Sequence, residues 1–397
     1  MKIRQKSESE FIIVMASLMS LVAFAIDALL PAVADISKTI HIADPKNNQL
    51  FITMIFLGIG FGQLVSGPLS DSFGRKPVIY IGFTVFVFAS FICLFATDLD
   101  TMIVGRLLQG VGLSAPRTIS IAMVRDRFNG NYMARVMSFI TVIFLLIPVI
   151  APALGKLLLD AYGWKSIFYS QLVVGVFIML WVWKRQPETL KIEKRKKFRL
   201  ALFVDGIKEF IKYKYAVIFT IFSGFITGSF MVYLSASQHI FVEQYNLEEE
   251  FPFIFAGLAI SIGLATFLNG KLVVKIGMFK LVFFFTAMFT IVSLLYIVFF
   301  WGDSNPSIYI LLLFFGLQFF SIGFLFGNTR ALAMEPIGHI AGVGAAINGF
   351  VSTIMAVPIA TYIGSYITTT ALPLFIGFFV CGAISLLLIT LLKFRKN

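Results

Sequence analysis

Two ionisable side chains lie inside segments that are otherwise apolar. Asp27 interrupts the stretch LVAFAIDALLPAVAD, and Arg106 lies in GRLLQGVG. A charged group in apolar surroundings is costly, so it normally faces a partner or water. An adjacent guanidinium favours the ionised carboxylate, whereas removal from water favours the neutral acid. We therefore predict that Asp27 takes up and releases a proton and that Arg106 biases this equilibrium; the alternative is a permanent ion pair that only packs two helices.

A second arginine, Arg117, falls on the same helical face as Arg106, because eleven residues bring a helix back to within about 20°. Two fixed positive charges disfavour purely cationic ligands and favour neutral, zwitterionic or acidic ones, with Arg117 as an anion contact. Alternatively, Arg117 extends to a polar interface or pairs with Asp71 or Asp126. Single polar residues in apolar helices more often join neighbouring helices than bind ligands. The further candidates for contact with a small molecule are Phe24, Gln109, Phe230, Tyr233, Gln318 and Asn348.

The segments that must position these residues are long and apolar. The chain has 397 residues, of which 59% are hydrophobic and 13% charged, against about 25% charged in soluble proteins. About twenty apolar residues in a helix suffice to cross a bilayer, so this composition predicts an all-α integral membrane protein. The first run is too long and too charged for a cleavable signal. Twelve runs are expected to cross: 11–34, 49–70, 77–97, 101–123, 136–157, 166–184, 216–240, 251–269, 281–301, 307–328, 341–366 and 372–392.

The positive charge follows the expected topology. The net charge is +12, and with the amino terminus inside, most lysines and arginines fall in the inner segments. The positive-inside rule therefore predicts that both termini are cytoplasmic. The basic balance then reflects topology and contact with anionic membrane lipids, and it does not indicate nucleic-acid binding.

Motifs for other classes of function are missing from the sequence. No H-E-x-x-H, G-x-S-x-G or Walker pattern occurs, and the three histidines are dispersed, so we expect neither an enzyme, a metal site nor an organic cofactor. Cys93 and Cys381 lie inside apolar runs, which argues against a disulfide or metal framework. A channel would need a continuous polar stripe, and only scattered polar residues are present.

The chain divides into two similar parts. We expect an N-terminal six-helix half at 1–190, a cytoplasmic linker with an amphipathic helix at 191–215, and a C-terminal six-helix half at 216–397. Gly67 and Gly74 after the second run have the same spacing as Gly270 and Gly277 after the eighth. Repeated halves with interrupted helices are typical of transporters that expose one site alternately to each side.

The loop GPLSDSFGRKP is more polar than a simple turn requires. Asp71 stands four residues before Arg75 and Lys76, where it could hold a neighbouring helix amino terminus or an arginine as a latch that opens when the halves tilt. Alternatively, the two basic residues are only topological anchors. Glu335 before the eleventh run is either a static helix cap or a gate with Arg330. The candidate gating residues are Gly67, Asp71, Gly74, Arg75, Lys76, Pro148, Pro152, Gly155 and Glu335.

These motifs resemble the major facilitator superfamily. Its loop between helices 2 and 3 reads G-x-x-x-D-R-x-G-R-R/K, and Gly67, Asp71, Gly74, Arg75 and Lys76 match, while Ser72 replaces the basic residue after the aspartate. GRLLQGVG is similar to the R-x-x-Q-G signature of drug:proton antiporters. IPVIAPALGKLLLDAYGWKSIF is similar to the antiporter fifth helix, although several family glycines are Ala or Leu here. IDALLPAVADI and ALAMEPIGHIAGVGAAINGF resemble the bicyclomycin/chloramphenicol-resistance branch.

The resemblance implies both a fold and an activity. The fold would be twelve transmembrane helices in two six-helix, pseudo-symmetric halves around a central cavity, lined by helices 1, 4, 7 and 10. The activity would be proton-coupled export of small amphiphilic drug-like or natural compounds from a bacterial cell across its inner membrane, by a functional monomer with H⁺ as coupling ion. The alternative is an importer or exporter of a specific anion, such as a carboxylate metabolite or siderophore.

Overall fold

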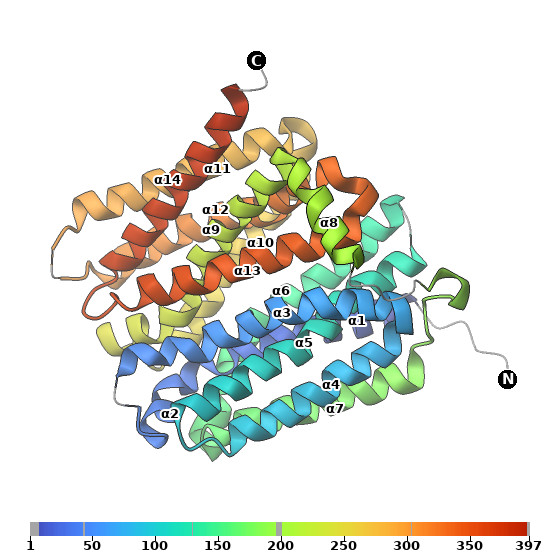
Figure 1. Cartoon of the computed structure of the whole chain (residues 1–397). Helices are drawn as coiled ribbons and strands as arrows, with labels where there is room; N and C mark the ends of the chain where they lie inside the picture. Colours follow the sequence, from blue (N-terminus) through green and yellow to red (C-terminus); the bar gives the residue numbers. More distant parts are fainter. Residues whose placement is uncertain (1–7, 43, 129, 196–200, 303, 395–397) are drawn as a thin grey trace. The chain divides into compact units, whose positions relative to one another are not determined.

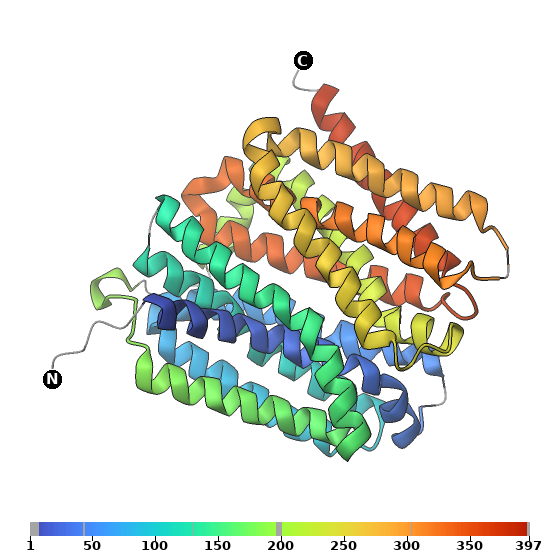
Figure 2. The same ribbon diagram turned by 180° about the vertical axis from the view of Figure 1, so that it is seen from behind.

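The structure is a computed structural model that describes residues 8–42, 44–128, 130–195, 201–302 and 304–394, with the side chains of some helical residues left out. Within these ranges it contains helices and no strand. The chain forms two compact units, Met1–Arg199 and Leu200–Asn397, which we call the N-terminal and C-terminal units. The boundary between them falls inside the segment 191–215. Figures 1 and 2 show the helices of each unit packed side by side.

The N-terminal unit is built from six long helices and several short ones within the described residues. Short turns connect the long helices, so neighbours in sequence mostly run in opposite directions (Figure 1). In chain order the elements are α1 (Glu8–Asp27), η1 (Leu30–Ala32), α2 (Val33–Thr39), η2 (Pro45–Gln49), α3 (Leu50–Phe73), α4 (Arg75–Leu94), α5 (Leu99–Arg127), α6 (Gly130–Tyr162), α7 (Lys165–Arg185) and η3 (Ile192–Lys194).

The C-terminal unit repeats this plan after one additional amphipathic helix, α8. It too has six long helices in the part that the structure describes. The elements are α8 (Ala201–Lys212), α9 (Lys214–Gln238), η4 (His239–Gln244), α10 (Phe251–Ile276), α11 (Met278–Phe299), α12 (Ile308–Met334), η5 (Glu335–Ile340), α13 (Ala341–Gly364) and α14 (Leu372–Phe394).

The long helices have the character of membrane spans. Among the described residues, eleven helices are long and apolar enough to cross a membrane. The twelfth long helix is α6, several of whose side chains are not described. Large apolar side chains also cover the outside of the units: Phe88 is 67% exposed, Val173 70% and Phe253 75%. Such a surface is stable in lipid, and together with the helix lengths it identifies a polytopic membrane protein.

Small residues bring α3 and α5 into close contact. A Cβ atom on Gly110 would lie 2.0 Å from the carbonyl oxygen of Ile55 and 2.9 Å from the Cα atom of Gly58. Glycine at such positions lets helix backbones approach where larger side chains would keep them apart. The contact holds α5 so close to α3 that a side chain one turn before Gly110 can reach the backbone of α3.

The first apolar run is not one continuous helix, contrary to the single run expected at 11–34. The α-helix α1 ends at Asp27, a turn and the 3₁₀ segment η1 follow, and α2 resumes at Val33. Pro31 accounts for the break, because it has no N–H to donate to the carbonyl of Asp27, four residues earlier. The break therefore places the one acidic residue of the run at a helix terminus inside the unit.

The two repeated glycine pairs form the same turn in both units. Gly74 separates α3 from α4 with φ 106°, and Gly277 separates α10 from α11 with φ 88°. Positive φ values of this kind favour glycine, since other residues are strained there. The shared turn extends the sequence repeat to the backbone conformation.

The linker helix α8 packs one face against its own unit. A Cβ atom on Gly206 would lie 2.4 Å from Cγ1 of Val343 in α13. Phe210 is buried in a small core with Ala216, Ile337 and Ile347. Part of the apolar face of α8 is thus covered by the C-terminal unit.

Candidate functional site

The guanidinium of Arg106 lies in the interior of the N-terminal unit and is bound by neutral oxygens. The side chain on α5 is 0% exposed. Its Nε donates to the carbonyl oxygen of Phe51 on α3 at 2.7 Å, and its Nη1 donates to the carbonyl of Ala25 on α1 at 3.2 Å and to Oε1 of Gln109 at 2.8 Å. Nη2 is buried without a hydrogen-bond partner among the described residues. One buried cation thereby connects three helices.

Gln109 extends this network to two further helices. Its Nε2 donates to Oγ of Ser90 on α4 at 2.8 Å and lies 3.5 Å from Oε1 of Gln171 on α7. Gln171 in turn donates to the carbonyl of Ala25 at 3.4 Å. Ser90, Gln109 and Gln171 are all 0% exposed. The carbonyl of Ala25 near the end of α1 therefore accepts hydrogen bonds from two side chains, Arg106 on α5 and Gln171 on α7.

Asp27 lies two residues beyond Ala25 and is 5% exposed. No hydrogen bond or ion pair within the described part of the chain involves its carboxyl group, and its contact with Arg106 expected from the sequence is absent in this structure. Its chain neighbours Ala28 and Leu29 belong to a buried apolar cluster, against which Phe24 also packs. The structure thus has the carboxyl and the guanidinium apart, although both belong to one region of the unit.

Gly155 of α6 packs directly on the break in α1. A Cβ atom at this position would lie 2.0 Å from the carbonyl oxygen of Ala28 and 2.8 Å from its carbonyl carbon. The helix α6 also contains Pro148 and Pro152. Gly155 is therefore in direct contact with the backbone of Ala28, the residue that follows Asp27.

The far end of α1 is tied to α7 by an ion pair. Glu10 accepts from Nε of Arg185 at 2.6 Å and from Nη2 at 2.9 Å, and Nε1 of Trp181 lies 3.3 Å from Glu10 Oε1. A bidentate arginine–carboxylate pair fixes orientation as well as distance. Because α1 is held at Glu10 and at Ala25, the carboxyl of Asp27 has a defined place in the unit.

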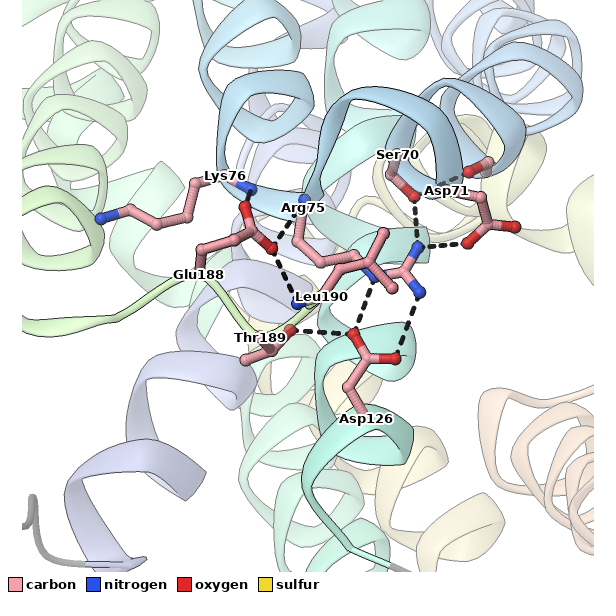
Figure 3. Close-up of polar contacts among 9 residues, drawn as sticks. Ser70, Asp71, Arg75, Lys76, Asp126, Glu188, Thr189 and Leu190 are labelled. Carbon is pink, nitrogen blue, oxygen red and sulfur yellow. Dashed lines mark hydrogen bonds and ion pairs between the residues drawn. The ribbon is translucent and has the colours of Figure 1, made fainter. Parts of the chain in front are cut away.

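A second polar cluster joins the α3–α4 turn to α5 (Figure 3). Arg75 is its centre, with a side chain 5% exposed. Its Nη1 donates to Asp71 at 2.5 Å and to Oγ of Ser70 at 2.8 Å, while Nε and Nη2 donate to the two carboxylate oxygens of Asp126 at 2.8 and 3.2 Å. The partner of Asp71 is thus Arg75 on the next helix. Arg75 in turn bridges the carboxylates of Asp71 on α3 and Asp126 on α5.

Glu188 caps the amino terminus of α4 (Figure 3). Its carboxylate oxygens accept from the backbone N–H groups of Arg75 and Lys76, both at 3.0 Å, and from the N–H of Leu190 at 2.9 Å. Beside it, the hydroxyl of Thr189 donates to Asp126 at 2.9 Å. A carboxylate at a helix amino terminus satisfies donors that the helix leaves free and interacts favourably with the helix dipole.

Neither Glu188 nor Thr189 was expected from the sequence to take part, and Asp126 was expected there only as a partner of Arg117. The available signal was weak: an acid and a hydroxyl in QPETL directly after the sixth run. Lys76, which was singled out, points away from this cluster, and its Nζ lies 3.3 Å from the carbonyl of Trp183.

The family follows from comparison with known proteins. A model described as "Major Facilitator Superfamily" matches residues 15–360. The chain belongs to this superfamily. It is a transporter and not an enzyme, which agrees with its helical architecture and with the relatives described next.

Relatives of this superfamily transporter are found along nearly its whole length. It is 28% identical over 394 residues to a bicyclomycin resistance protein homolog of Haemophilus influenzae, covering 97% of this chain and 96% of the relative. A multidrug resistance protein MdtL of Citrobacter koseri is 30% identical over 172 residues, or 43% of this chain and 44% of that protein.

Solved structures confirm the fold. The xylose transporter XylE from E. coli, in a partially occluded inward-open conformation, superposes with a TM-score of 0.72 at 13% identity, covering 97% of both chains. The human organic anion transporter MFSD10 gives a TM-score of 0.68 at 16% identity, covering 98% of this chain and 100% of that one. At these identities the likeness concerns the fold alone.

In this superfamily transporter, the substrate candidates of the C-terminal unit have partners inside the unit. Tyr233 packs among aromatic rings, with the ring of Phe319 4.5 Å away and that of Phe315 5.3 Å away, and it is 1% exposed. Phe230 lies at the edge of the same group, 5.5 Å from Phe326. These contacts make Tyr233 a core residue of the unit.

Gln318 and Asn348 join neighbouring helices. Gln318 on α12 donates to Oγ of Ser293 on α11 at 2.7 Å, and Asn348 on α13 donates to Oγ1 of Thr220 on α9 at 2.9 Å. Both are nearly fully buried. Such bonds between membrane helices engage the amide nitrogen of both side chains, while Oε1 of Gln318 is buried without a hydrogen-bond partner among the described residues.

The remaining candidates have the following surroundings. Arg117 is half-buried on α5, next to Pro116 within the helix. Phe24 packs against the apolar cluster around Ala28. Glu335 is exposed at the start of η5, and Arg330 lies one turn earlier with its guanidinium 6.0 Å from the ring of Phe326. No ion pair links Glu335 to Arg330 in the described residues. Gly67, unlike Gly155, has open space where a Cβ would lie.

Proposed function

We propose that this protein is a proton-coupled exporter of small amphiphilic compounds, in which Asp27 carries the coupling proton and Arg106 governs its release. The observation that carries the proposal is the buried carboxyl of Asp27 at a helix break, two residues from a backbone carbonyl held by a buried guanidinium. Among the residues that the structure describes, this carboxyl has no hydrogen-bond or ion-pair partner. If Asp27 and Arg106 formed a permanent ion pair, the carboxyl and the guanidinium would be in contact in this structure.

The proton enters because the separated carboxyl group is unstable as an ion. In dry surroundings without a cationic partner, the neutral acid costs less free energy than the carboxylate. If the break in α1 moves so that the carboxyl reaches water or the free Nη2 of Arg106, the ion is stabilised and the proton leaves. Movement is directed by the elements that hold α1: Arg106 and Gln171 at Ala25, and Gly155 at Ala28.

The second cluster supplies a latch for such movement. Arg75 bridges Asp71 and Asp126 at one end of the N-terminal unit, with Asp71 the more exposed of the two carboxylates. We propose that this end faces the cytoplasm, as do both termini, and that the protein acts as a monomer in a bacterial inner membrane. The basic residues of the segment 184–214 support this orientation through the positive-inside rule.

The substrate class rests on the relatives. Proteins named for resistance to bicyclomycin and to multiple drugs support efflux of amphiphilic compounds of that kind. A second candidate substrate is an organic anion. The observation that favours it is the guanidinium of Arg106, which is balanced only by neutral oxygens in the described residues. Because this side chain is 0% exposed here, it would meet an organic anion only after α1, α3 and α5 move apart.

The test is transport by Asp27→Asn in membrane vesicles of both orientations. Inverted vesicles with an acidic interior should accumulate substrate with the wild type and fail to do so with the variant, while counterflow without a proton gradient continues. Accumulation only in right-side-out vesicles would indicate import. Proton-driven accumulation by Asp27→Asn equal to that of the wild type would remove Asp27 from the mechanism. A panel of cationic, neutral and anionic amphiphiles distinguishes the two substrate classes.

A further inference from the structure

His239 lies at the end of α9 opposite to α8, where the helix passes into the π-helical segment η4 (His239–Gln244). Both of its ring nitrogens face oxygen acceptors. Nδ1 is 2.7 Å from Oε2 of Glu243, one turn later, and Nε2 is 2.8 Å from the carbonyl oxygen of Thr368 in the α13–α14 loop. Wider π-helical turns of this kind occur mostly as single turns and frequently at functional sites.

The two contacts of the ring need one more proton than a neutral imidazole and a carboxylate carry together. A neutral imidazole has one N–H and a carboxylate has none, so together they could satisfy only one of the two contacts. One added proton satisfies both, because an imidazolium donates from each nitrogen. Imidazole is a stronger base than a carboxylate, with ordinary pKa values of about 6.5 and 4.3, so the added proton belongs on the ring. The side chain of His239 is 29% exposed, which gives water access to it.

The carbonyl of Thr368 also accepts from a second donor, and the α11–α12 connection takes part in the same cluster. Nε2 of Gln244 lies 3.3 Å from the oxygen of Thr368. Asn305 of the α11–α12 connection donates to Gln244 at 3.0 Å and accepts from the N–H of Ala371 at 2.8 Å. The end of α9 is thereby connected to both loops at this side of the C-terminal unit.

We propose that His239 and Glu243 form a proton-binding site in the C-terminal unit, and that the bound proton fastens the end of α9 to the α13–α14 loop. Without the proton, a ring lone pair faces either the carboxylate or the carbonyl, and one of the two contacts becomes repulsive. The site is separate from Asp27, which lies in the other unit. Its placement on the outer, proton-rich side rests on the orientation given under the proposed function.

The surroundings contain no competing charge in contact with the ring. Among the described residues, Glu243 is the charged group that touches His239, and the α13–α14 loop contributes only a carbonyl. Asn305 is uncharged. Tyr245 donates its hydroxyl to the carbonyl of Pro306 at 2.8 Å, and burial raises its pKa to about 12, so it stays neutral. Loss of the added proton is therefore the expected change of charge in this cluster between pH 5 and 8.

Nitrogen NMR of the histidine rings tests the site directly, because the chain has only three histidines. The full-length protein is labelled on histidine nitrogen, and His41→Gln and His239→Gln assign the signals. We expect His239 to carry both ring protons at pH 7.5, because each nitrogen faces an oxygen acceptor. In Glu243→Gln, His239 should become neutral at that pH. Equal protonation of His239 and His41 at every pH would overturn the proposal.

Transport at fixed internal pH and varied external pH tests its consequence. External pH also sets the driving force carried by Asp27, so the comparison is made for counterflow in the Asp27→Asn background. We expect its rate to change by about fivefold between external pH 5.5 and 8, with the change lost when His239→Gln is added and kept when the matched control His41→Gln is added. An unchanged pH profile in His239→Gln would overturn the proposed role of the proton. The NMR result is independent of transport, so failure of the proposed proton coupling at Asp27 would be recognised separately by Asp27→Asn.

Discussion

Gly155 lies so close to Ala28 that a Cβ atom on the glycine would be 2.0 Å from the alanine carbonyl oxygen. The contact joins α6 to the break in α1, immediately after the buried carboxyl of Asp27. A helix break has free backbone carbonyls, and a glycine allows the neighbouring helix to pack on them at this distance. The proposed proton site therefore depends on a residue that has no side chain.

Gly155→Ala should disturb this contact. The added methyl group meets backbone atoms, which cannot rotate away, so α6 or the break must shift. We expect the free energy of unfolding to fall by about 1–3 kcal/mol, as for other overpacked sites, and proton-driven transport to fall with it. Thermal unfolding in detergent and vesicle transport measure the two effects. Gly257→Ala on α10 is the control, because its Cβ would enter open space; equal effects of both changes would contradict the explanation.

Pro31→Ala should lengthen α1 past Asp27. The new N–H can bond to the carbonyl of Asp27, so a continuous helix no longer carries the cost of an interior proline, about 3 kcal/mol. We expect stability to be equal or higher, while transport falls by about tenfold because the carboxyl leaves its place at a helix end. Pro358→Ala in α13, far along the chain from Asp27, is the comparison. Wild-type transport by Pro31→Ala would show that the break is dispensable.

Arg106→Lys should lower both stability and transport, although it keeps the positive charge. A single ammonium group cannot reach the carbonyl oxygens of Phe51 and Ala25 together with the amide of Gln109, whereas the guanidinium fork does. Hydrogen bonds to charged groups are worth about 1.5–3 kcal/mol each, so we expect a loss of that order in unfolding free energy and little transport. Arg185→Lys, at a 56% exposed side chain, should change both quantities much less.

Glu188→Ala should weaken the α3–α4 turn. The N–H groups of Arg75 and Lys76 lose their acceptor, and the loss of a helix cap costs about 0.5–2 kcal/mol. Thermal unfolding should show this decrease, and Glu188→Gln should recover part of it because an amide oxygen still accepts. Glu193→Ala, an exposed acid five residues on, serves as the control. A decrease no larger than that of Glu193→Ala would mean that the cap is not an important contact.

Asp27 and Arg106 could be recognised from the sequence because charges within apolar runs are rare and costly. Their surroundings could not. Ser90 and Gln171 are ordinary polar residues in their own helices, and they become part of the Arg106 network only because α4 packs beside α5 while α7 packs against α1 and α4. Glu188 lies in a polar segment, where an acidic residue is common and indicates no particular contact. Tyr233, Gln318 and Asn348 were recognised as polar, but the sequence does not say whether such a side chain points to a neighbouring helix or to a ligand.

Apolar length, charge and glycine spacing were enough to predict an all-helical membrane protein that resembles the major facilitator superfamily, with equivalent turns near Gly74 and Gly277. These properties are local, because they can be read along one segment. The packed helices were needed to show that α1 ends at Asp27, that Arg106 binds neutral oxygens in place of the acid, and that His239 bridges Glu243 and Thr368. Each of these depends on which backbone atoms a side chain meets across helices, and residues far apart in the chain become neighbours only when those helices pack.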